Sequence, residues 1–566
     1  MYRVWLLTVA LLWGTVLLSF ESVLARSLSE RVSESLRDRI TISTQPQEIV
    51  CGTEPLCRSA MLSRFYRDRA FRPAWSTEEG PRALAAILVK AIHEATLEGL
   101  EPEDYHLVAI EALLMETGHT RGANRALEPE NLADLDLLLS DAFLLYGSHL
   151  SAGRVSPEAI RSESFIKSRA VDVVEILHST LDEEQIKEAL ETLRPQHPGY
   201  AGLNRALLSY ETISKGGGWK VVPGGQQMRK GDRGMRVGAL RSRLIVSGDL
   251  DESTDSDPCL FDEGLEQGIR RFQKRHGLDI DGIVGPATLA ALNVPMEERI
   301  RQIKVNMERW RRLPYEFGRR YILVNIADFK LDVVENDKVL ITMRVVVGRR
   351  SRPTPVFTGK MTYMELNPYW HIPPTIAKED ILPNIWKDPA YLLKANIRVF
   401  RGWKAQAPEI NPLSVDWFQT TAKGFPFKLR QEPGPSNALG RIKFMFPNTF
   451  DVYLHDTPAR ALFEKSKRSS SSGCIRVEKP IELAEYLVQG DPKWSRENIL
   501  AAINSNETQI VLMREPIAVH VLYWTAWVDE DDTVQFRDDI YGRDKLLNEA
   551  LSDRPPKLLA ILKGSL

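Results

Sequence analysis

The sequence has little cysteine for its length and no excess of charge of either sign. Four cysteines occur in 566 residues and none forms a C-x-x-C pair, which excludes a disulfide-rich scaffold and zinc clusters of the usual spacing. The 74 Lys+Arg and 76 Asp+Glu residues give a formal net charge of −2. This balance argues against a nucleic-acid partner, which would require a basic excess, and against an acidic disordered protein. None of the ten histidines forms H-x-x-x-H or H-x-H, so a metallopeptidase is disfavoured and no metal or cofactor is expected.

Long apolar runs are absent after the first 25 residues. At the start, Arg3 precedes an apolar run from Val4 to Leu18, and the small-residue end Val23–Ala25 follows. This layout is typical of a secretory signal peptide over residues 1–25. An uncleaved membrane anchor is the alternative, although the run is short for a span of about 20 residues. Both interpretations predict export, and only the second predicts contact with a membrane.

Export permits disulfides, so each cysteine is judged by its surroundings. Cys51 and Cys57 flank the turn-rich segment 52–56, and a local disulfide and two free thiols both stay open because spacing does not fix geometry. Cys259 follows the polar stretch 253–258 and is expected to be a loop thiol. Cys474 is the cysteine with chemically informative neighbours.

The first half of the chain is predicted to be helical. The composition, 43% hydrophobic and 27% charged, is that of a folded protein, and the length indicates about three or four domains. Apolar residues such as Leu84, Leu88 and Ile92 recur at helical spacing from about 60 to 215. We therefore expect a helical domain over 44–216, ended by a glycine-rich linker.

Two smaller helical segments follow the linker. Residues 228–294 have apolar residues at helical spacing and close on glycine-rich turns, which predicts a compact three-helix module. Residues 295–319 form a basic helical connector. Contact with an anionic polymer is one interpretation of its arginines, and a solvated helix face is the one we favour.

The pattern changes to β-structure after residue 319. Branched residues dominate Tyr321–Asn325 and Val339–Val347, and a turn is expected just before the second run. Residues 373–433, rich in Pro, Trp and Phe, are predicted to be a lid inserted over a site on a mostly-β domain spanning 320–515. The remaining 516–566 are expected to be a β-rich extension that packs on the sheet, followed by a tail. The fold class is therefore multidomain α+β.

The chemical centre is predicted where a strand ending in His455 meets the segment Gly473-Cys474. Nucleophilic catalysis by cysteine requires a thiolate, and a free thiol with a pKa of about 8.5 is mostly protonated at neutral pH. A nearby imidazole takes the proton. Gly473 has no Cβ, so a substrate carbonyl can approach and backbone N–H groups can hold the developing oxyanion.

This pattern resembles the YkuD-type L,D-transpeptidase domain, in which a His is followed by S-x-G-C-x-R with the cysteine as nucleophile. The matching residues are His455, Ser471, Gly473, Cys474 and Arg476. Many members have a second His where this chain has Ser472. The aromatic and proline motifs of 367–444 and the motifs Phe65-Tyr66 and Pro73-Ala-Trp75 are similar to those of the large periplasmic members, which combine a helical scaffold domain, a peptidoglycan-binding module and a lid.

Residues 228–294 resemble the three-helix peptidoglycan-binding module. The pattern G-D-x-G-x-x-V, F-Q-x-x-x-G-L and D-G-x-x-G-x-x-T is present, with a polar insertion around Cys259 as the departure. The resemblance implies contact with glycan, and a spacer without binding activity is the alternative.

The resemblance implies a two-step acyl transfer in the periplasm. Cys474 is the implied nucleophile and His455 the base and then the acid, acting on a tetrapeptide stem of peptidoglycan with release of D-Ala to form 3→3 cross-links. Water as acceptor would make an L,D-carboxypeptidase, and a lipoprotein lysine as acceptor would make an attachment enzyme. A non-catalytic wall-binding scaffold is disfavoured by the intact pair.

Four further residues are candidates for substrate binding. Tyr453 lies two residues before His455 and hence on the same strand face. Arg476 is expected either to bind a substrate carboxylate or to brace the loop, and Ser472 adjoins the glycine. Trp370 is expected either to line the groove or to be a core aromatic. Asp456 lies on the face opposite to His455, so its side chain is a poor candidate to orient the imidazole.

Overall fold

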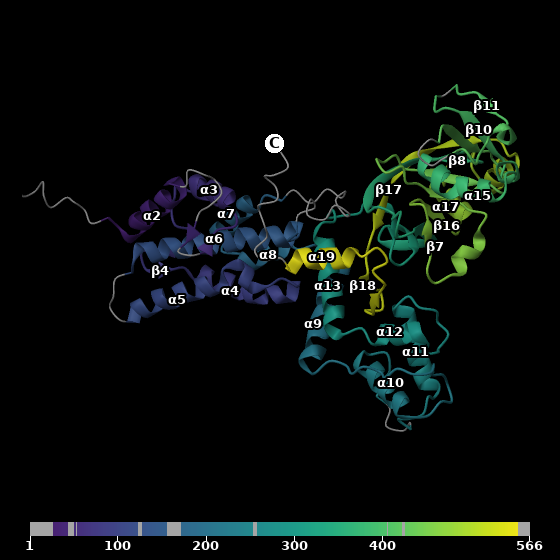
Figure 1. Cartoon of the computed structure of the whole chain (residues 1–566). Helices are drawn as coiled ribbons and strands as arrows, with labels where there is room; N and C mark the ends of the chain where they lie inside the picture. Colours follow the sequence, from purple (N-terminus) through teal and green to yellow (C-terminus); the bar gives the residue numbers. More distant parts are fainter. Residues whose placement is uncertain are drawn as a thin grey trace, which may run out of the picture. The chain divides into compact units, whose positions relative to one another are not determined.

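The computed structural model describes residues 26–42, 50–51, 54–122, 127–155, 171–252, 257–404, 406–420 and 425–552. The chain divides into two compact units, traced in Figure 1. We call Met1–Arg154 with Ala170–Pro195 the helical unit, and Val155–Arg169 with Gln196–Leu566 the sheet unit. Within the described ranges, no helix has the length and apolar character to cross a membrane. The predicted signal segment 1–25 and the side chain of Cys51 lie outside these ranges, so both hypotheses about them stay predictions.

The helical unit is built around one helix that is buried on nearly every side, α6. A helix that is apolar all round belongs in the centre of a core, and the apolar residues of the surrounding helices form one cluster with it. The helices of this unit are α2 (Leu28–Ile42), α3 (Ser59–Asp68), α4 (Ala83–His93), α5 (Leu107–Gly122), α6 (Pro129–Ala152), α7 (Val173–Glu183) and α8 (Ile186–Leu193).

The predicted helical domain of 44–216 is corrected at both ends. α2 lies before residue 44, and Val32 and Leu36 on it are buried in the core of the helical unit. α9 (Pro198–Lys215) belongs to the sheet unit, where Leu203 and Leu207 join the same apolar cluster as the sheet. Helical periodicity shows which face of a helix is apolar, but not which core covers that face.

The predicted three-helix module contains α10 (Met235–Val246), α11 (Glu263–Arg275) and α12 (Pro286–Leu292) around its own small core. It is packed into the sheet unit rather than tethered to it. The guanidinium of Arg275, buried at the end of α11, lies 2.5 Å from the Asp249 carboxylate, and the Arg275 carbonyl accepts a hydrogen bond of 2.9 Å from Arg537. The rings of His276 and Phe536 also stack.

The basic connector is not a solvated face, which corrects our expectation. It forms α13 (Met296–Arg311), and Arg311 is 1% exposed. Arg311 and Arg312 each lie 3.1 Å from the fully buried carboxylate of Glu308, and Arg309 lies 2.6 Å from Asp544. Buried charges are tolerated where they are paired and hydrogen-bonded, and these carboxylates supply the pairing.

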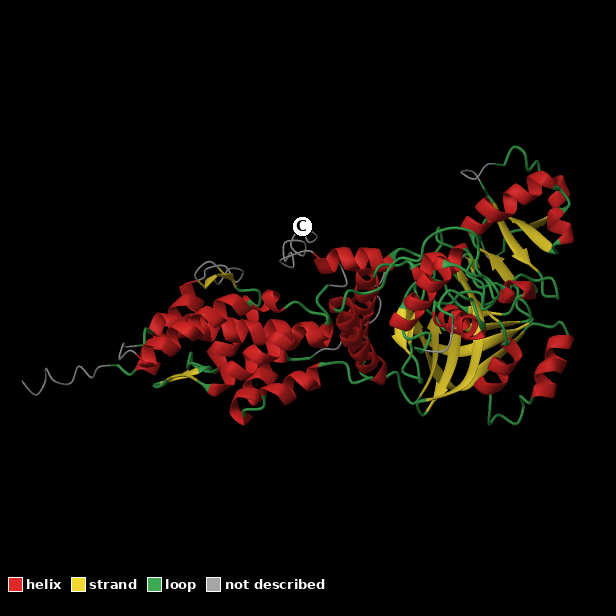
Figure 2. Cartoon of the chain, turned by 90° about the horizontal axis from the view of Figure 1, so that it is seen from below, coloured by secondary structure: helices red, strands yellow, loops and turns green. Residues whose placement is uncertain are grey.

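The sheet unit carries a sheet of nine strands in the order β15-β7-β16-β14-β13-β8-β17-β5-β6. β6 also pairs with β7, so eight of the strands form a closed ring, seen as the large yellow sheet in Figure 2. β14 and β16 are parallel neighbours within it. The strands are β5 (Arg320–Asn325), β6 (Lys330–Glu335), β7 (Lys338–Gly348), β8 (Phe357–Leu366), β13 (Ile442–Met445), β14 (Leu454–His455), β15 (Ser469–Ser471), β16 (Ile475–Val477) and β17 (Gln509–Leu522).

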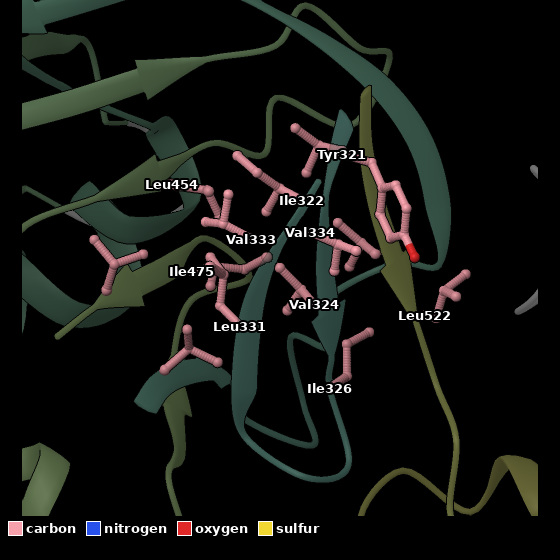
Figure 3. Close-up of a cluster of buried hydrophobic side chains, with 14 of the residues drawn as sticks. Tyr321, Ile322, Val324, Ile326, Leu331, Val333, Val334, Leu454, Ile475 and Leu522 are labelled. Atoms are coloured by element: carbon pink, nitrogen blue, oxygen red, sulfur yellow. The ribbon is translucent and has the colours of Figure 1, made fainter. Parts of the chain in front are cut away.

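One face of this sheet is the core and the other carries the candidate site. Leu454 of β14 and Ile475 of β16 are fully buried and point into the apolar cluster with Ile322 and Val333 (Figure 3). Because side chains alternate along a strand, the residues beside Leu454 and Ile475 project to the opposite face. Packing of this cluster therefore fixes the direction in which the candidate catalytic residues point.

The predicted lid of 373–433 is a compact insertion with its own apolar core, and it begins earlier than predicted, because the strand Trp370–Ile372 belongs to its small sheet. Its small sheet has the order β11-β10-β12-β9, and one face of that sheet packs on short helices. Its elements are β9 (Trp370–Ile372), α14 (Pro374–Ile376), η4 (Ala377–Ile381), α15 (Leu382–Lys387), α16 (Tyr391–Lys394), β10 (Ile397–Arg401), β11 (Glu409–Ile410), η5 (Pro412–Ser414) and β12 (Phe427–Gln431).

The predicted boundary between 515 and 516 is corrected, because it falls inside β17. The ladder between β17 and β8 is irregular between Leu512 and Ile517, where the chain carries Arg514-Glu515-Pro516. Charged residues and a proline resemble a strand break in sequence, whereas a bulge accommodates them without ending the strand. β18 (Ala526–Val528) and β19 (Val534–Phe536) form a separate hairpin. Ala526 and Phe536 are buried in the same apolar cluster as the sheet, which confirms that this region packs on the sheet.

The predicted turn before the second β run is present. The hairpin between β6 and β7 has Asn336 and Asp337 at positive φ, as a tight two-residue turn requires. The remaining helices are η6 (Arg460–Glu464), α17 (Pro480–Leu487), α18 (Arg496–Asn504) and α19 (Arg543–Ser552).

Candidate active site

Cys474 lies in a short bend between β15 and β16. The preceding Gly473 has φ +116°, and a Cβ built on it would meet open space, so glycine is required by the backbone and leaves room beside the thiol. The Gly473 N–H donates to Ser471 Oγ at 3.2 Å. The Cys474 N–H makes no hydrogen bond within the described part of the chain, and is thus the available backbone donor in this bend.

His455 comes from the neighbouring strand. Leu454 pairs with Ile475 and His455 with Arg476 in the parallel ladder of β14 and β16. The same register places Cys474 beside Tyr453, so that Cys474 and His455 are diagonal neighbours on one face, within reach of each other's side chains.

A backbone carbonyl orients the imidazole. His455 Nδ1 lies 2.6 Å from the carbonyl oxygen of Asp456, so Nδ1 carries the hydrogen and Nε2 is the basic nitrogen of the neutral ring. The Asp456 side chain does not take this role, because its Oδ2 accepts from the Arg441 N–H at 2.8 Å. These contacts identify the orienting group that sequence left unnamed.

The nucleophile and the imidazole are both neutral in the free protein. Burial and the nearby Arg476 lower the pKa of His455 to about 3. Burial raises the pKa of the Cys474 thiol, against the opposing effect of hydrogen bonds from Tyr453. Desolvation disfavours the charged form of each group, so the resting site holds a thiol and a neutral base.

Tyr453 completes the wall next to the thiol. Its ring packs edge-on against the His455 ring, with centroids 5.7 Å apart. Burial and the neighbouring Cys474 raise the pKa of the Tyr453 phenol well above its usual value. A neutral phenol hydroxyl therefore lies beside the thiol.

Two cations flank the pair. Arg476 is half-buried, and its Nε has no hydrogen-bond partner among the described residues. Lys443 of β13 pairs with His455 in the ladder, and its Nζ lies 4.5 Å from the centre of the Tyr453 ring. The sequence pointed to Lys443 only as part of the family motif Lys443-Phe444 and gave it no role at the site. Its alternation with the core residue Phe444 on a predicted strand is the signal that could have done so.

Ser472 is held by an arginine that also reaches the insertion. Arg352 donates to Ser472 Oγ at 2.9 Å and lies 2.5 Å from the Asp380 carboxylate of η4. Arg349 lies 2.9 Å from the same carboxylate. The nucleophile bend and the insertion are therefore joined through these side chains.

The nucleophile bend is also held from beneath by Thr354. Its buried Oγ1 donates to the Gly473 carbonyl at 2.8 Å and accepts from the Gly348 N–H at 2.9 Å. The Tyr541 hydroxyl donates to the Gly348 carbonyl at 2.6 Å and accepts from the Thr354 N–H. These partners lie far apart in sequence, and no local pattern predicts them.

Trp370 lies in β9, opposite Gln431 of β12. It is half-buried and packs against the apolar cluster of the insertion. This contact agrees with the alternative in which Trp370 is a core aromatic. That Trp370 lines the groove stays a prediction.

Two other features lie apart from the pair. A cavity of about 670 Å³ opens beyond His455 and is lined by Arg441, Asp456 and Arg460, but neither Cys474 nor His455 lines it. In the helical unit, ligand atoms of Cys57, His106 and Asp141 lie within 4.8 Å of one another. The Asp141 carboxylate already accepts from two backbone N–H groups and contacts His106 at 2.8 Å, so it serves the fold.

Three family profiles match separate parts of the chain. Residues 319–494 match the YkuD family, described as the L,D-transpeptidase catalytic domain. Residues 233–292 match the "Putative peptidoglycan binding domain", and residues 60–207 match the scaffold domain. The order of these matches is the order expected from the motifs.

Individual proteins and solved structures are similar to parts of the chain. A "Putative L,D-transpeptidase" of Haemophilus influenzae is 36% identical over 250 residues, covering 44% of this chain and 49% of the relative, so the chain spans about half of that protein. The amidase CwlM of Mycobacterium tuberculosis is 40% identical over 75 residues, 12% of this chain and 18% of CwlM. A crystal structure of an L,D-transpeptidase from Stackebrandtia nassauensis is 13% identical, with a TM-score of 0.21, over 52% of this chain and 94% of that one. The sheet around Cys474 is thus a YkuD-type L,D-transpeptidase catalytic domain, combined in one chain with a peptidoglycan-binding domain and a scaffold domain.

Proposed function

We propose that the protein is an L,D-transpeptidase that forms 3→3 cross-links in peptidoglycan through an acyl-enzyme on Cys474. The observation that carries the proposal is the juxtaposition of the Cys474 thiol with an imidazole oriented by the Asp456 carbonyl, within a domain of this family. Thiol and base in this arrangement are the minimum for nucleophilic acyl transfer.

The first step transfers the acyl group to the protein. Cys474 Sγ attacks the L-centre carbonyl carbon of diaminopimelate in a donor tetrapeptide, and the thiol proton passes to His455 Nε2. The bond to the nitrogen of the terminal D-Ala then breaks, and His455 returns the proton to this leaving amine. The products are free D-Ala and a thioester on Cys474.

The second step regenerates the thiol. An amine of a neighbouring stem attacks the thioester carbonyl and gives its proton to His455, the carbon–sulfur bond breaks, and Cys474 regains the proton. The neutral imidazole, whose pKa burial and Arg476 lower to about 3, is in the basic form that both attacks require. In each tetrahedral intermediate the Cys474 N–H is the backbone donor that we assign to the oxyanion, because the Gly473 N–H is engaged by Ser471.

Arg476 is the proposed carboxylate ligand for the substrate. Burial lowers the pKa of Arg476, yet the group stays a cation, and its Nε lacks a partner among the described residues. An unpaired, half-buried guanidinium is costly unless a ligand supplies the missing acceptor. Tyr453 and Ser472 border the same space, and the peptidoglycan-binding domain would hold the glycan.

Incubation with purified disaccharide-tetrapeptide, followed by mass spectrometry, tests the proposal. A cross-linked dimer with release of D-Ala is expected. Tripeptide alone would indicate water as acceptor and an L,D-carboxypeptidase, and dimer formation only after a lipoprotein lysine peptide is added would indicate attachment of lipoproteins. Unchanged substrate with a correctly folded protein would contradict acyl transfer altogether.

The substrate implies where the protein works. Peptidoglycan stems lie outside the cytoplasmic membrane, so we propose a periplasmic, wall-associated location. Fractionation of cells with an antibody to the sheet unit tests this, and a cytoplasmic signal would contradict it.

A further inference from the structure

A row of side chains crosses the sheet from the catalytic pair to solvent. His455 pairs with Lys443, Lys443 with Glu365, and Glu365 with Ile510, in the ladders of β14, β13, β8 and β17. Residues that pair across strands share a face, so all four project from the face that carries Cys474. Ile510 at the far end is 65% exposed, and the row is therefore open to a ligand at that end.

Lys443 and Glu365 are two opposite charges in the middle of this row. The Lys443 Nζ lies 3.7 Å from the Glu365 carboxylate, and the side chains are only 15% and 19% exposed. Beyond this ion pair, neither side chain makes a hydrogen bond to a described residue. Partly buried charges are costly while their hydrogen-bonding capacity is unused, so this pair has donors and an acceptor to offer.

The charge of Lys443 is directed at the cleft. Burial raises the pKa of the Cys474 thiol, and the Lys443 charge is among the groups that oppose this rise. Burial and Arg476 lower the pKa of His455, and Lys443 adds to this fall. The same charge also acts on His371 of the insertion, whose pKa burial and then Lys428, Arg430 and Lys443 lower. One ammonium group therefore acts on the nucleophile, the base and the insertion.

We propose that Lys443 and Glu365 form a zwitterionic clamp for the D-centre of the donor diaminopimelate. This inference rests on the proposed function and names a specificity site for it. The side chain of diaminopimelate ends in a carbon that carries both a carboxylate and an ammonium, so Lys443 binds the carboxylate and Glu365 the ammonium. With neighbouring strands about 4.8 Å apart, the backbones of Lys443 and Glu365 lie two and three strands away from the strand that follows Cys474. The Lys443 side chain shortens this gap, because its Nζ lies 4.5 Å from the centre of the Tyr453 ring, which the ladder register places beside Cys474. The methylene chain from the L-centre spans the remaining distance.

The charges assign the clamp to the donor stem rather than to the acceptor. An amine held by the Glu365 carboxylate stays protonated, because a nearby opposite charge favours the charged form. An ammonium has no lone pair with which to attack the thioester. The clamp therefore keeps the donor's own amine out of the reaction, while the acceptor amine enters elsewhere.

A pair of donor stems tests the clamp. The full-length protein is given tetrapeptide with diaminopimelate, or with L-lysine, which has the ammonium but lacks the D-centre carboxylate, and kcat/KM for D-Ala release is measured. We expect the wild type to prefer the diaminopimelate stem by about 30-fold, the size of effect expected for the loss of one hydrogen bond to a charged group. Lys443→Met should lose this preference, because removal of the charge near the thiol affects both stems, whereas removal of the carboxylate ligand lowers kcat/KM further on the diaminopimelate stem.

Matched variants keep the test specific. Glu365→Gln should weaken the wild-type preference for a stem with a free D-centre amine over one in which that amine is acetylated. Lys360→Met, an exposed lysine on the same strand β8, should leave all ratios unchanged. A purely structural defect in Lys443→Met would lower activity on both stems equally, and that result would overturn the clamp.

Different results would contradict the clamp and the proposed transpeptidase function. Equal turnover of the diaminopimelate and lysine stems by the wild type would overturn the clamp and leave the proposed function standing. No D-Ala release from either stem would overturn both. Retained discrimination in Lys443→Met would assign recognition of the carboxylate to another residue.

Discussion

Two buried titratable side chains in this protein differ in how completely the fold satisfies them. Asp136 of α6 is fully buried, and its carboxylate accepts from the N–H groups of Ala74 and Trp75 and from the hydroxyls of Tyr66 and Ser76 at 2.7–3.1 Å. Burial raises the pKa of Asp136, and these donors oppose the rise. The network is closed, as structural polar groups in a core usually are.

His455 has the opposite surroundings. It is 4% exposed and is oriented by the Asp456 carbonyl, with a further backbone hydrogen bond to Leu439, but its neighbours retain capacity for other partners. Arg476 Nε and the Cys474 N–H have no partner among the described residues, and the space beside Gly473 is open. Burial alone therefore does not distinguish a structural polar group from a functional one. The two differ in whether the hydrogen-bonding groups around them are satisfied.

Removal of the nucleophile should have the largest effect and should fall on activity alone. Cys474→Ala is expected to abolish turnover, a loss of roughly a thousandfold or more, because Cys474 is the cysteine on the strand face that carries His455. The free energy of unfolding should stay within about 0.5 kcal/mol, since the side chain lies in an open bend. D-Ala release and chemical denaturation measure the two quantities, and residual turnover in this variant would contradict the cysteine mechanism.

Removal of Asp136 should have the converse effect. Asp136→Ala leaves the buried N–H groups of Ala74 and Trp75 without acceptors, and we expect the helical unit to lose roughly 3 kcal/mol or more. Hydrogen exchange read by mass spectrometry on the full chain should show faster exchange in peptides of α6, with peptides of β14 and β16 unchanged. Asp182→Ala, at an exposed carboxylate of the same unit, is the control, and equal exchange in both variants would refute the closed-network interpretation.

The sequence predicts the site residues that lie in short local motifs, but not the site residues whose roles depend on long-range pairing. Cys474 and His455 each lie in a short diagnostic segment, so motif and strand alternation suffice to propose them. Lys443, Glu365 and Thr354 acquire their roles only through ladder register and contacts over more than 70 positions, which no local pattern encodes.

The fold shows the same division. The helical half, the β-rich half and the hairpin at Asn336 follow from periodicity and turn chemistry. The allocation of α9 to the sheet unit and the burial of Arg311 on α13 do not, because each depends on a partner surface distant in sequence. Charge on a helix predicts a solvated face only when no carboxylate such as Glu308 is buried next to it.

The neutral resting state of the pair predicts the pH dependence of thiol reactivity. Because burial raises the pKa of Cys474, alkylation by iodoacetamide should rise about tenfold per pH unit from pH 7 to 9. Because the pKa of His455 is about 3, no inflection is expected near pH 6. The charged and titratable groups that face the thiol are His455, Tyr453, Lys443 and Arg476.

Peptide mass spectrometry would follow this alkylation at Cys474, with the loop thiol Cys259 as an internal control. At pH 8 Cys474 should react more slowly than Cys259. If the reactivity of Cys474 instead stayed constant down to acidic pH, the resting site would hold a thiolate–imidazolium pair. The thiolate and the imidazolium would then satisfy each other, as the donors around Asp136 satisfy its carboxylate.

The smallest effect is expected at Thr354, where a closed network supports the open one. Thr354→Val keeps the shape of the side chain but removes the hydroxyl that joins the Gly348 N–H to the Gly473 carbonyl. A buried N–H left without an acceptor costs about 1–3 kcal/mol, and part of this cost should appear as displacement of the bend that presents Cys474. We expect kcat for D-Ala release to fall about tenfold, equivalent to about 1.4 kcal/mol, with KM unchanged. Thr354→Ser restores the hydroxyl and should restore kcat, whereas an equal loss in both variants would show that the methyl group, not the hydrogen bonds, holds the bend.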